Sequence, residues 1–153
     1  TSETVKDFTF RAHEKGGNII ITSEGSDFTI KGDPGQFQIM LGNILDNSLK
    51  YCSGKPEINI MLKSTDGKLI LEIADNGPGI PEEYHNKVFE KYFRLPAGEI
   101  QKAEGFGLGL YQSRQIVRQM KGNITISAGK ETGLKIIISL PIYKNDEKPG
   151  DKN

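Results

Sequence analysis

The sequence has little of several features that would restrict its function. It contains one cysteine and two histidines, so it can form neither an intrachain disulfide nor a zinc cluster, and a reducing compartment is expected. Its 20 basic and 20 acidic residues cancel, which argues against general attraction to nucleic acid or to an anionic membrane. Apolar runs such as residues 69–74 fall far short of the roughly 20 residues that span a bilayer. We therefore expect a cytoplasmic protein without a nucleic-acid partner.

Glycine, by contrast, is abundant. The chain has 18 glycines among 153 residues, above the usual share of about 7%, and such an excess predicts tight turns or backbone lying close to a ligand. The length suits a single domain with a full hydrophobic core, which we place at residues 1–143, and the polar residues 144–153 are expected to be disordered. Because the chain does not begin with methionine, we expect an excised fragment. We also expect this fragment to be monomeric.

Two segments predict full helices. Asp33 is a good N-cap, Pro34 suits a first helical position, and Gln36 completes a capping-box pattern, so a helix is expected to run to about residue 50. A second helix is predicted over residues 108–121, with Gly122 at the C′ position that ends it. Shorter helical pieces are expected within residues 1–15 and 81–93.

Three pairs of β-rich runs predict hairpins. They are residues 18–23 with 27–31, residues 57–63 with 68–75 across an Asp-Gly turn, and residues 123–128 with 134–140. With about six strands and about three helices, the pattern predicts a two-layer α/β sandwich. Its mixed, mainly antiparallel sheet would carry the helices on one face and expose the other to water.

The first predicted helix carries a polar stripe beside its apolar arc. Asn43, Asn47, Lys50 and Tyr51 fall within about 100° of one another around the helix axis. Asparagine is a poor helix former, so two of them four residues apart require an explanation. Their amide oxygens can ligate Mg²⁺ while the lysine and tyrosine reach a ligand's phosphates and its sugar or base. A solvated polar face with hydrogen bonds between the asparagines is the alternative.

A second candidate lies where a predicted strand ends. Strand parity places Asp75 at the end of an apolar row, and a buried carboxylate is costly unless something donates hydrogen bonds to it. The exocyclic amine of a purine is one such donor, and Gly77 and Gly79 would let the backbone approach the ring. Because Asn-Gly is a common turn dipeptide, a plain turn explains the segment equally.

A third candidate is the glycine-rich segment before the second predicted helix. Gly105, Gly107 and Gly109 would expose unpaired N–H groups to an anion at a helix N-terminus, although a flexible hinge would use the same residues. The 12-residue stretch 95–106 shows no clear helical or strand periodicity, which predicts a lid or a disordered loop. Aromatic residues precede this stretch, and Arg94 beside them is a candidate phosphate contact.

In this order and spacing, four segments resemble the N, G1, F and G2 boxes of the sensor histidine kinase catalytic and ATP-binding domain. That domain belongs to a superfamily shared with gyrase, the mismatch-repair ATPases and a chaperone ATPase. The four segments are residues 43–51, 75–80, 89–94 and 105–110, and the resemblance covers residues 17–141. It implies the Bergerat ATP-binding fold.

The resemblance also implies roles for individual residues. Asn47 would ligate a Mg²⁺ that bridges the ATP phosphates, Lys50 would contact phosphate, and Tyr51 would flank the ribose and base. Asp75 would accept from the adenine amine, and Asn43 and Lys50 would serve catalysis. The remaining residues that it assigns to nucleotide binding are Gly77, Gly79, Ile80, Phe93, Arg94, Gly105, Phe106, Gly107, Leu108 and Gly109.

The implied reaction is transfer of the ATP γ-phosphoryl group to a histidine on a separate dimerisation domain, with a response regulator receiver domain downstream. His13 and Glu14 begin like an acceptor motif, but the residues after them lack its proline, so we expect the acceptor and dimerisation helices to be absent. A membrane anchor of the full protein would lie outside this chain as well. Phe106 stands where a small residue is frequent, which puts the details of lid closure in doubt.

Two alternatives to a kinase are an ATP hydrolase of the same superfamily and a non-catalytic nucleotide-sensing module. The hydrolases resemble this fold but carry a glutamate, the general base for water, where Asn43 stands. An amide cannot take a proton near neutral pH, so Asn43 favours phosphoryl transfer. The presence of all four boxes argues against the sensing module.

Overall fold

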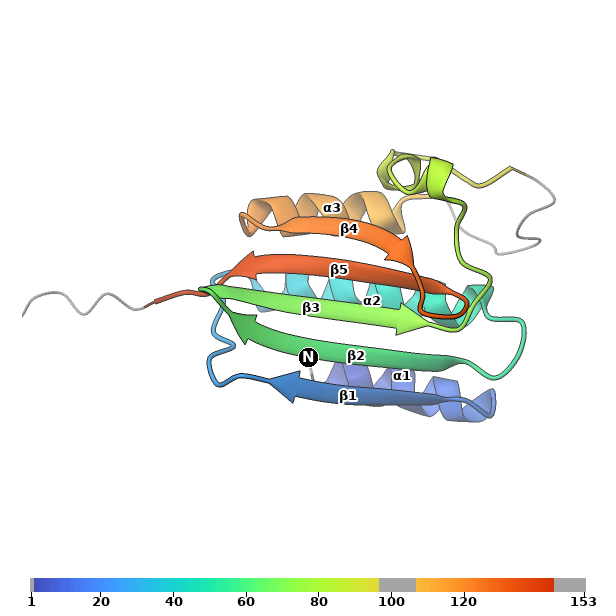
Figure 1. The fold of residues 1–153 in the computed structure, drawn as a ribbon, viewed down its shortest axis with the longest axis horizontal. Helices are drawn as coiled ribbons and strands as arrows, with labels where there is room; N and C mark the ends of the chain where they lie inside the picture. Colours follow the sequence, from blue (N-terminus) through green and yellow to red (C-terminus); the bar gives the residue numbers. More distant parts are fainter. Residues whose placement is uncertain (1, 97–106, 145–153) are drawn as a thin grey trace, which may run out of the picture.

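A five-stranded sheet organises the molecule, with the strands in the order β1-β2-β3-β5-β4 (Figure 1). The computed structural model describes residues 2–96 and 107–144. Strand β1 runs parallel to β2, and every other neighbouring pair is antiparallel. The strands are β1 (Asn18–Glu24), β2 (Glu57–Thr65), β3 (Lys68–Asp75), β4 (Asn123–Ala128) and β5 (Leu134–Pro141). The prediction of a mixed, mainly antiparallel sheet is confirmed.

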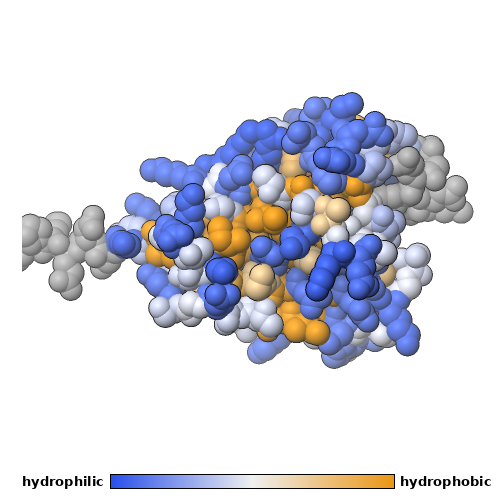
Figure 2. Space-filling view, in the orientation of Figure 1, coloured by the Kyte–Doolittle hydropathy of each residue, from blue (hydrophilic) through white to orange (hydrophobic). Residues whose placement is uncertain are grey.

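Three α-helices cover one face of this sheet, which confirms the predicted two-layer sandwich (Figure 1). They are α1 (Ser2–Glu14), α2 (Pro34–Tyr51) and α3 (Gly109–Gln119). Leu71 and Ile73 of β3 point into the core beneath the helices, whereas the alternating Ile70 and Glu72 lie on the other face and are only half-buried. Figure 2 shows that uncovered face, where apolar side chains over the central strands are surrounded by hydrophilic ones.

Helix α2 forms the crossover connection from β1 to β2, and it forms where the sequence predicts a helix. Asp33 caps it, because its Oδ1 accepts a hydrogen bond of 3.0 Å from the backbone N–H of Gln36, and Pro34 occupies the first turn. The side chains that α2 buries are Met40, Leu41, Ile44, Leu45, Ser48 and Leu49. This apolar arc fixes the rotation of the helix and therefore turns the adjoining polar stripe toward the end of β3 and the start of β5.

The prediction of only a short helical turn before residue 15 is wrong. Helix α1 spans 13 residues, because Val5, Phe8 and Ala12 recur at helical spacing and pack into the core. It ends in a Schellman motif, in which Gly16 has φ +73° and Gly17 N–H donates to the Ala12 carbonyl. The first strand therefore follows a full helix that packs against α2.

The prediction of a hairpin between residues 18–23 and 27–31 is also wrong, and the sheet has five strands rather than six. β1 pairs with β2 through the α2 crossover, in the register that sets Asn18 opposite Glu57. After β1 the chain turns, with Asp27 Oδ1 accepting from the backbone N–H of Thr29. Only Ile30 forms a bridge, to Ile142.

The other predicted hairpins are confirmed, with two smaller corrections nearby. The segment 81–93 forms two separate 3₁₀ turns, Glu82–Tyr84 and Lys87–Phe89. At the end of α3 the left-handed C′ residue is Lys121, at φ 59°, and not Gly122. Gly122 follows at C″, where a Cβ would overlap the carbonyl oxygen of Ser139.

Parts of two predictions fall outside the described residues. They concern the lid beyond residue 96, including Gly105 and Phe106, and the polar tail from residue 145. Among the described helices, none has the length and apolar character needed to cross a membrane.

A cavity between α2 and the ends of β3 and β5

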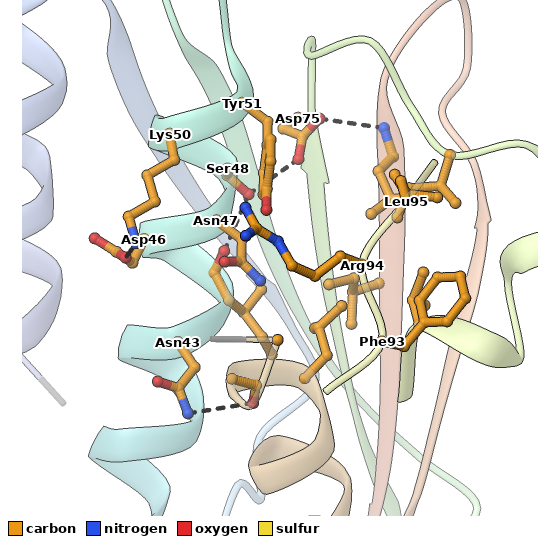
Figure 3. A pocket seen from close by; sticks show the side chains of 18 of the residues that line it. Asn43, Asp46, Asn47, Ser48, Lys50, Tyr51, Asp75, Phe93, Arg94 and Leu95 are labelled. Carbon is orange, nitrogen blue, oxygen red and sulfur yellow. Dashed lines mark hydrogen bonds and ion pairs between the residues drawn. The ribbon is translucent and has the colours of Figure 1, made fainter. Parts of the chain in front are cut away.

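A cavity of about 400 Å³ brings together most of the residues that the sequence selected (Figure 3). One wall is the polar stripe of α2, and the opposite wall comes from the end of β3, the start of β5 and the segment after Phe89. The predicted residues that line it are Asn43, Asn47, Lys50, Tyr51, Asp75, Gly79, Ile80, Phe93, Arg94, Gly107, Leu108 and Gly109. Gly77 lies behind this lining and is buried.

Asp75 is held by hydrogen bonds from three parts of the fold. Its Oδ1 accepts from the backbone N–H groups of Gly77, at 3.0 Å, and Leu134, at 3.2 Å, while its Oδ2 accepts from the Ser48 hydroxyl at 3.0 Å. A carboxylate offers about four acceptor positions, so one remains on Oδ2. The protein therefore fixes the orientation of this carboxylate and leaves room for one external donor.

Two glycines allow close backbone packing around Asp75. Gly133 has φ +84°, and a Cβ there would overlap the carbonyl oxygen of Asp75. Gly79 has φ +74°, and its Cβ would lie 2.9 Å from the carbonyl oxygen of Gly133. The backbones of the β3 end and the β4–β5 hairpin can approach this closely only because neither residue has a side chain.

We expect Gly133→Ala to destabilise the protein by about 2–5 kcal/mol. A left-handed backbone costs alanine about 1–2 kcal/mol, and steric overlap in a packed site typically costs about 1–3 kcal/mol more. Gly54→Ala is the matched control, because nothing lies within 4 Å of its Cβ position and its φ is not positive. Urea denaturation of both variants gives the comparison, and equal unfolding midpoints would contradict the role given to Gly133.

The two asparagines of α2 have different surroundings. Asn43 donates through Nδ2 to the Gly109 carbonyl, at 3.3 Å, and to Gln112 Oε1, at 3.1 Å, and so joins α2 to the start of α3. The Asn47 side chain lines the cavity without a hydrogen bond to any other described residue. Its amide oxygen is therefore available to a ligand or to a hard cation.

No cluster of three or more histidine, cysteine, aspartate or glutamate side chains that could hold a metal ion occurs in residues 2–96 and 107–144. The amide oxygen of Asn47 nevertheless fits Mg²⁺, which is commonly held by few protein ligands together with water and phosphate oxygens. A Mg²⁺ at this wall would thus depend on a bound polyphosphate for most of its coordination.

Two cationic side chains, Lys50 and Arg94, line the cavity together with the asparagines. Lys50 lies on α2, and Figure 3 shows the Arg94 side chain extending across the cavity toward this helix. The N-terminus of α3 also faces the cavity, and Leu108 at its N-cap provides no side-chain hydrogen bond to the first N–H groups. Cations and unpaired helical N–H groups together favour an anion here.

Asp46 connects this charged end to helix α1. Its Oδ1 pairs with Arg11 at 2.8 Å and its Oδ2 with Lys50 at 3.0 Å. Partial burial would raise the pKa of the Asp46 carboxyl, but the hydrogen bonds and charges of Arg11 and Lys50 outweigh this effect and lower that pKa below its usual value. The carboxylate is therefore charged across the physiological pH range.

The segments on either side of residues 97–106 meet at the wall of the cavity. Tyr92 N–H donates to the Gly107 carbonyl at 3.2 Å, and a Cβ on Gly107, at φ +68°, would lie 2.6 Å from the Phe93 carbonyl oxygen. The Phe93 ring packs against Tyr84 with centroids 5.9 Å apart. Gly107 of the predicted glycine segment is thus in direct contact with the predicted aromatic segment.

Several residues that shape the cavity were not predicted from the sequence. Ser48 lies among the buried apolar side chains of α2, and a hydroxyl in such a position signals a buried hydrogen-bond partner, which is Asp75. No sequence signal marked Gly133 or Leu134, because their contact with Asp75 arises only from strand pairing. Other lining residues that were not predicted are Ile44, Asp46, Pro78, Val88, Leu95, Leu110, Gln112 and Ile136.

Comparison with known proteins gives a consistent result. Residues 32–144 match the family described as histidine kinase-, DNA gyrase B-, and HSP90-like ATPase. Over 146 residues the chain is 34% identical to sensor protein RprX of Bacteroides fragilis, covering 93% of this chain and 28% of that protein. It is 36% identical over 105 residues to sensor protein CiaH of Streptococcus pneumoniae, covering 66% of this chain and 24% of the relative.

The fold agrees with solved structures. A mycobacterial sensor histidine kinase, MprB, superposes with a TM-score of 0.76 at 27% identity, covering 92% of this chain and 94% of that one. The catalytic domain of the histidine kinase ThkA has a TM-score of 0.77 at 22% identity, covering 92% and 88%, and supports the fold alone. The chain spans about a quarter of the length of the curated relatives that it matches.

Proposed function

The chain belongs to the family of histidine kinase-, DNA gyrase B- and HSP90-like ATPases, and we propose that it binds Mg²⁺–ATP in the cavity beside α2. Within that family it is the ATP-binding catalytic domain of a sensor histidine kinase. We take residues 1–143 as this single domain. The ends of the cavity differ in chemistry, and this difference determines how the nucleotide would lie.

The adenine would lie at the Asp75 end. Oδ2 of Asp75 has one acceptor position left, which suits the exocyclic amine of adenine and does not suit a carbonyl oxygen at the same ring position. Ile80 supplies apolar contact for the ring, and Tyr51 at the rim would flank the ribose and base. Gly77 would act from behind the cavity by orienting Asp75 through its N–H group.

The triphosphate would lie at the charged end. Lys50 and Arg94 would neutralise its oxygens, and the first N–H groups of α3, beginning at Gly109, would donate to them. Asn47 would hold Mg²⁺ through its amide oxygen. When bound between phosphate oxygens, the ion supplies charge neutralisation and alignment of the phosphoryl group. The observation that carries the proposal is that this end and the Asp75 end belong to one cavity.

The reaction would be phosphoryl transfer rather than hydrolysis. Asn43, where a hydrolase needs a general base, is an amide whose nitrogen already donates to Gly109 and Gln112. Its role would be to hold α2 against the start of α3 around the phosphates. The acceptor would be a histidine on the dimerisation domain of the same protein, with the receiver domain of a response regulator downstream.

A transfer experiment tests this function. The chain is incubated with Mg²⁺ and γ-labelled ATP, together with the histidine-bearing helix pair from the full protein. Acid-labile phosphate on the helix pair, lost when its histidine is replaced, is the expected result. Rapid phosphate release without the helix pair would instead support a hydrolase, and nucleotide binding with neither product would support a sensing module.

Ser48→Ala is expected to weaken ATP binding about three- to tenfold while the fold is retained. The variant removes one of the donors that orient Asp75, and Ser48 would affect ATP only through that carboxylate. We therefore expect a loss within the range of about 0.5–1.5 kcal/mol that a typical hydrogen bond contributes. Ser64→Ala is the matched control, because it also removes a serine hydroxyl but lies near the end of β2, away from the cavity lining. Calorimetric titration with ATP measures both, and equal affinities would contradict the assigned role of Ser48.

A further inference from the structure

One carboxylate in this fold is shared by two cations that belong to different helices. Asp46 lies on α2, immediately before Asn47, and its two oxygens are divided between Arg11 of α1, at 2.8 Å, and Lys50 of α2, at 3.0 Å. Lys50 and Asp46 line the cavity, whereas Arg11 does not. A residue outside the nucleotide site therefore competes for the same partner as the lysine inside it.

Arg11 is held in place for this contact. Its guanidinium lies 4.5 Å from the centre of the Phe8 ring, and Phe8 is buried between α1 and the rest of the core. One helical turn later, Lys15 Nζ donates to the Leu49 carbonyl at 3.0 Å, which fastens the end of α1 to α2. The position of α1 along α2 thus sets the distance between Arg11 and Asp46.

The charges of these three residues determine how Arg11 would affect the interaction of Lys50 with phosphate. Arg11, Asp46 and Lys50 together carry a net charge of +1, so Lys50 can attract phosphate while Asp46 stays neutralised by the arginine. Without Arg11, the pair formed by Asp46 and Lys50 would be neutral, and the carboxylate would hold the ammonium more strongly and repel phosphate itself. The side chains are 31–41% exposed, so solvent weakens but does not remove these interactions.

We propose that Arg11 is a positioning residue for nucleotide phosphates, which neutralises Asp46 and so makes Lys50 available to them. This inference rests on the proposed ATP site and adds to it a link from α1, the first helix of the chain. A shift of α1 that separated Arg11 from Asp46 would lower the affinity for phosphates without changing the adenine end of the cavity.

Calorimetric titration with ATP and with adenosine tests the inference. Arg11→Met keeps an unbranched stem beside Phe8 and is expected to weaken ATP binding about three- to fivefold while adenosine affinity stays the same. Lys6→Met, an exposed lysine on the same helix, is the matched control and should leave both affinities unchanged. Equal losses for ATP and adenosine would overturn the inference, because they would indicate a purely structural effect.

A second substitution removes the group through which Arg11 acts. Asp46→Asn is expected to tighten ATP binding about two- to fivefold, and adding Arg11→Met to it should then have no further effect on ATP. Unchanged or weaker ATP binding by Asp46→Asn, or an undiminished Arg11→Met effect in the double variant, would refute the inference. If the unaltered chain bound neither ATP nor adenosine, the proposed function itself would fail instead.

Discussion

Asp75→Asn is expected to weaken ATP binding by on the order of a hundredfold, about 3 kcal/mol. The hydrogen bonds of the fold decide how the new amide would lie. Its oxygen must take the Oδ1 position, since the N–H groups of Gly77 and Leu134 both donate there. The NH₂ group then occupies the Oδ2 position and opposes the adenine amine, donor against donor.

The control for this variant is Asp66→Asn in the turn between β2 and β3, where the side chain is exposed. Calorimetry should give an unchanged ATP affinity for the control and little or no measurable heat for Asp75→Asn. Circular dichroism should show that both variants are folded. If Asp75→Asn bound ATP with the affinity of the unaltered chain, the assignment of the adenine end would be wrong.

Asn47→Ala is expected to lower the rate of phosphoryl transfer by at least about a hundredfold. Its side chain lines the charged end of the cavity and has no other described partner, so the variant removes a proposed Mg²⁺ ligand without breaking a protein contact. Loss of metal-dependent charge neutralisation costs several kcal/mol in reactions of this kind, and each 1.36 kcal/mol changes the rate tenfold. The assay measures labelled phosphate on the histidine-bearing helix pair.

Two comparisons make this second result specific. Added Mg²⁺ should increase the ATP affinity of the unaltered chain but not that of Asn47→Ala, whereas adenosine should bind both equally. Asn59→Ala, on the exposed face of β2, is the control for loss of an asparagine and should transfer phosphate normally. A normal transfer rate for Asn47→Ala would remove this residue from the metal site.

Much of the local structure was predictable because its causes are close together in the sequence. The cap at Asp33 involves Gln36, three residues away, and the turn at Asp66 and Gly67 needs only two adjacent residues that tolerate positive φ. The polar stripe of α2 follows from helical periodicity alone. For the same reason the pattern predicted that Asn47 and Lys50 lie on one wall of a site.

The errors arose where a local pattern competes with long-range pairing. Residues 18–23 and 27–31 look like a hairpin, but β1 gains more by joining the sheet beside β2, across the α2 crossover. Helix α1 was underestimated because its apolar side chains, Phe8 and Ala12 among them, are few and find their partners on α2 and β1. Neither the pairing of β1 with β2 nor the packing of α1 can be predicted from a short window of sequence.

The sequence by itself determined the two-layer architecture, the four motifs and the side chains that could serve a nucleotide. Only the tertiary structure decided how those side chains are held. Asp75 is oriented by Ser48 and Leu134, which are 27 and 59 residues away along the chain, and Asp46 is paired with Arg11, 35 residues away. Motifs record which chemical groups are present, whereas hydrogen bonds and ion pairs depend on positions that only the packed sheet and helices define.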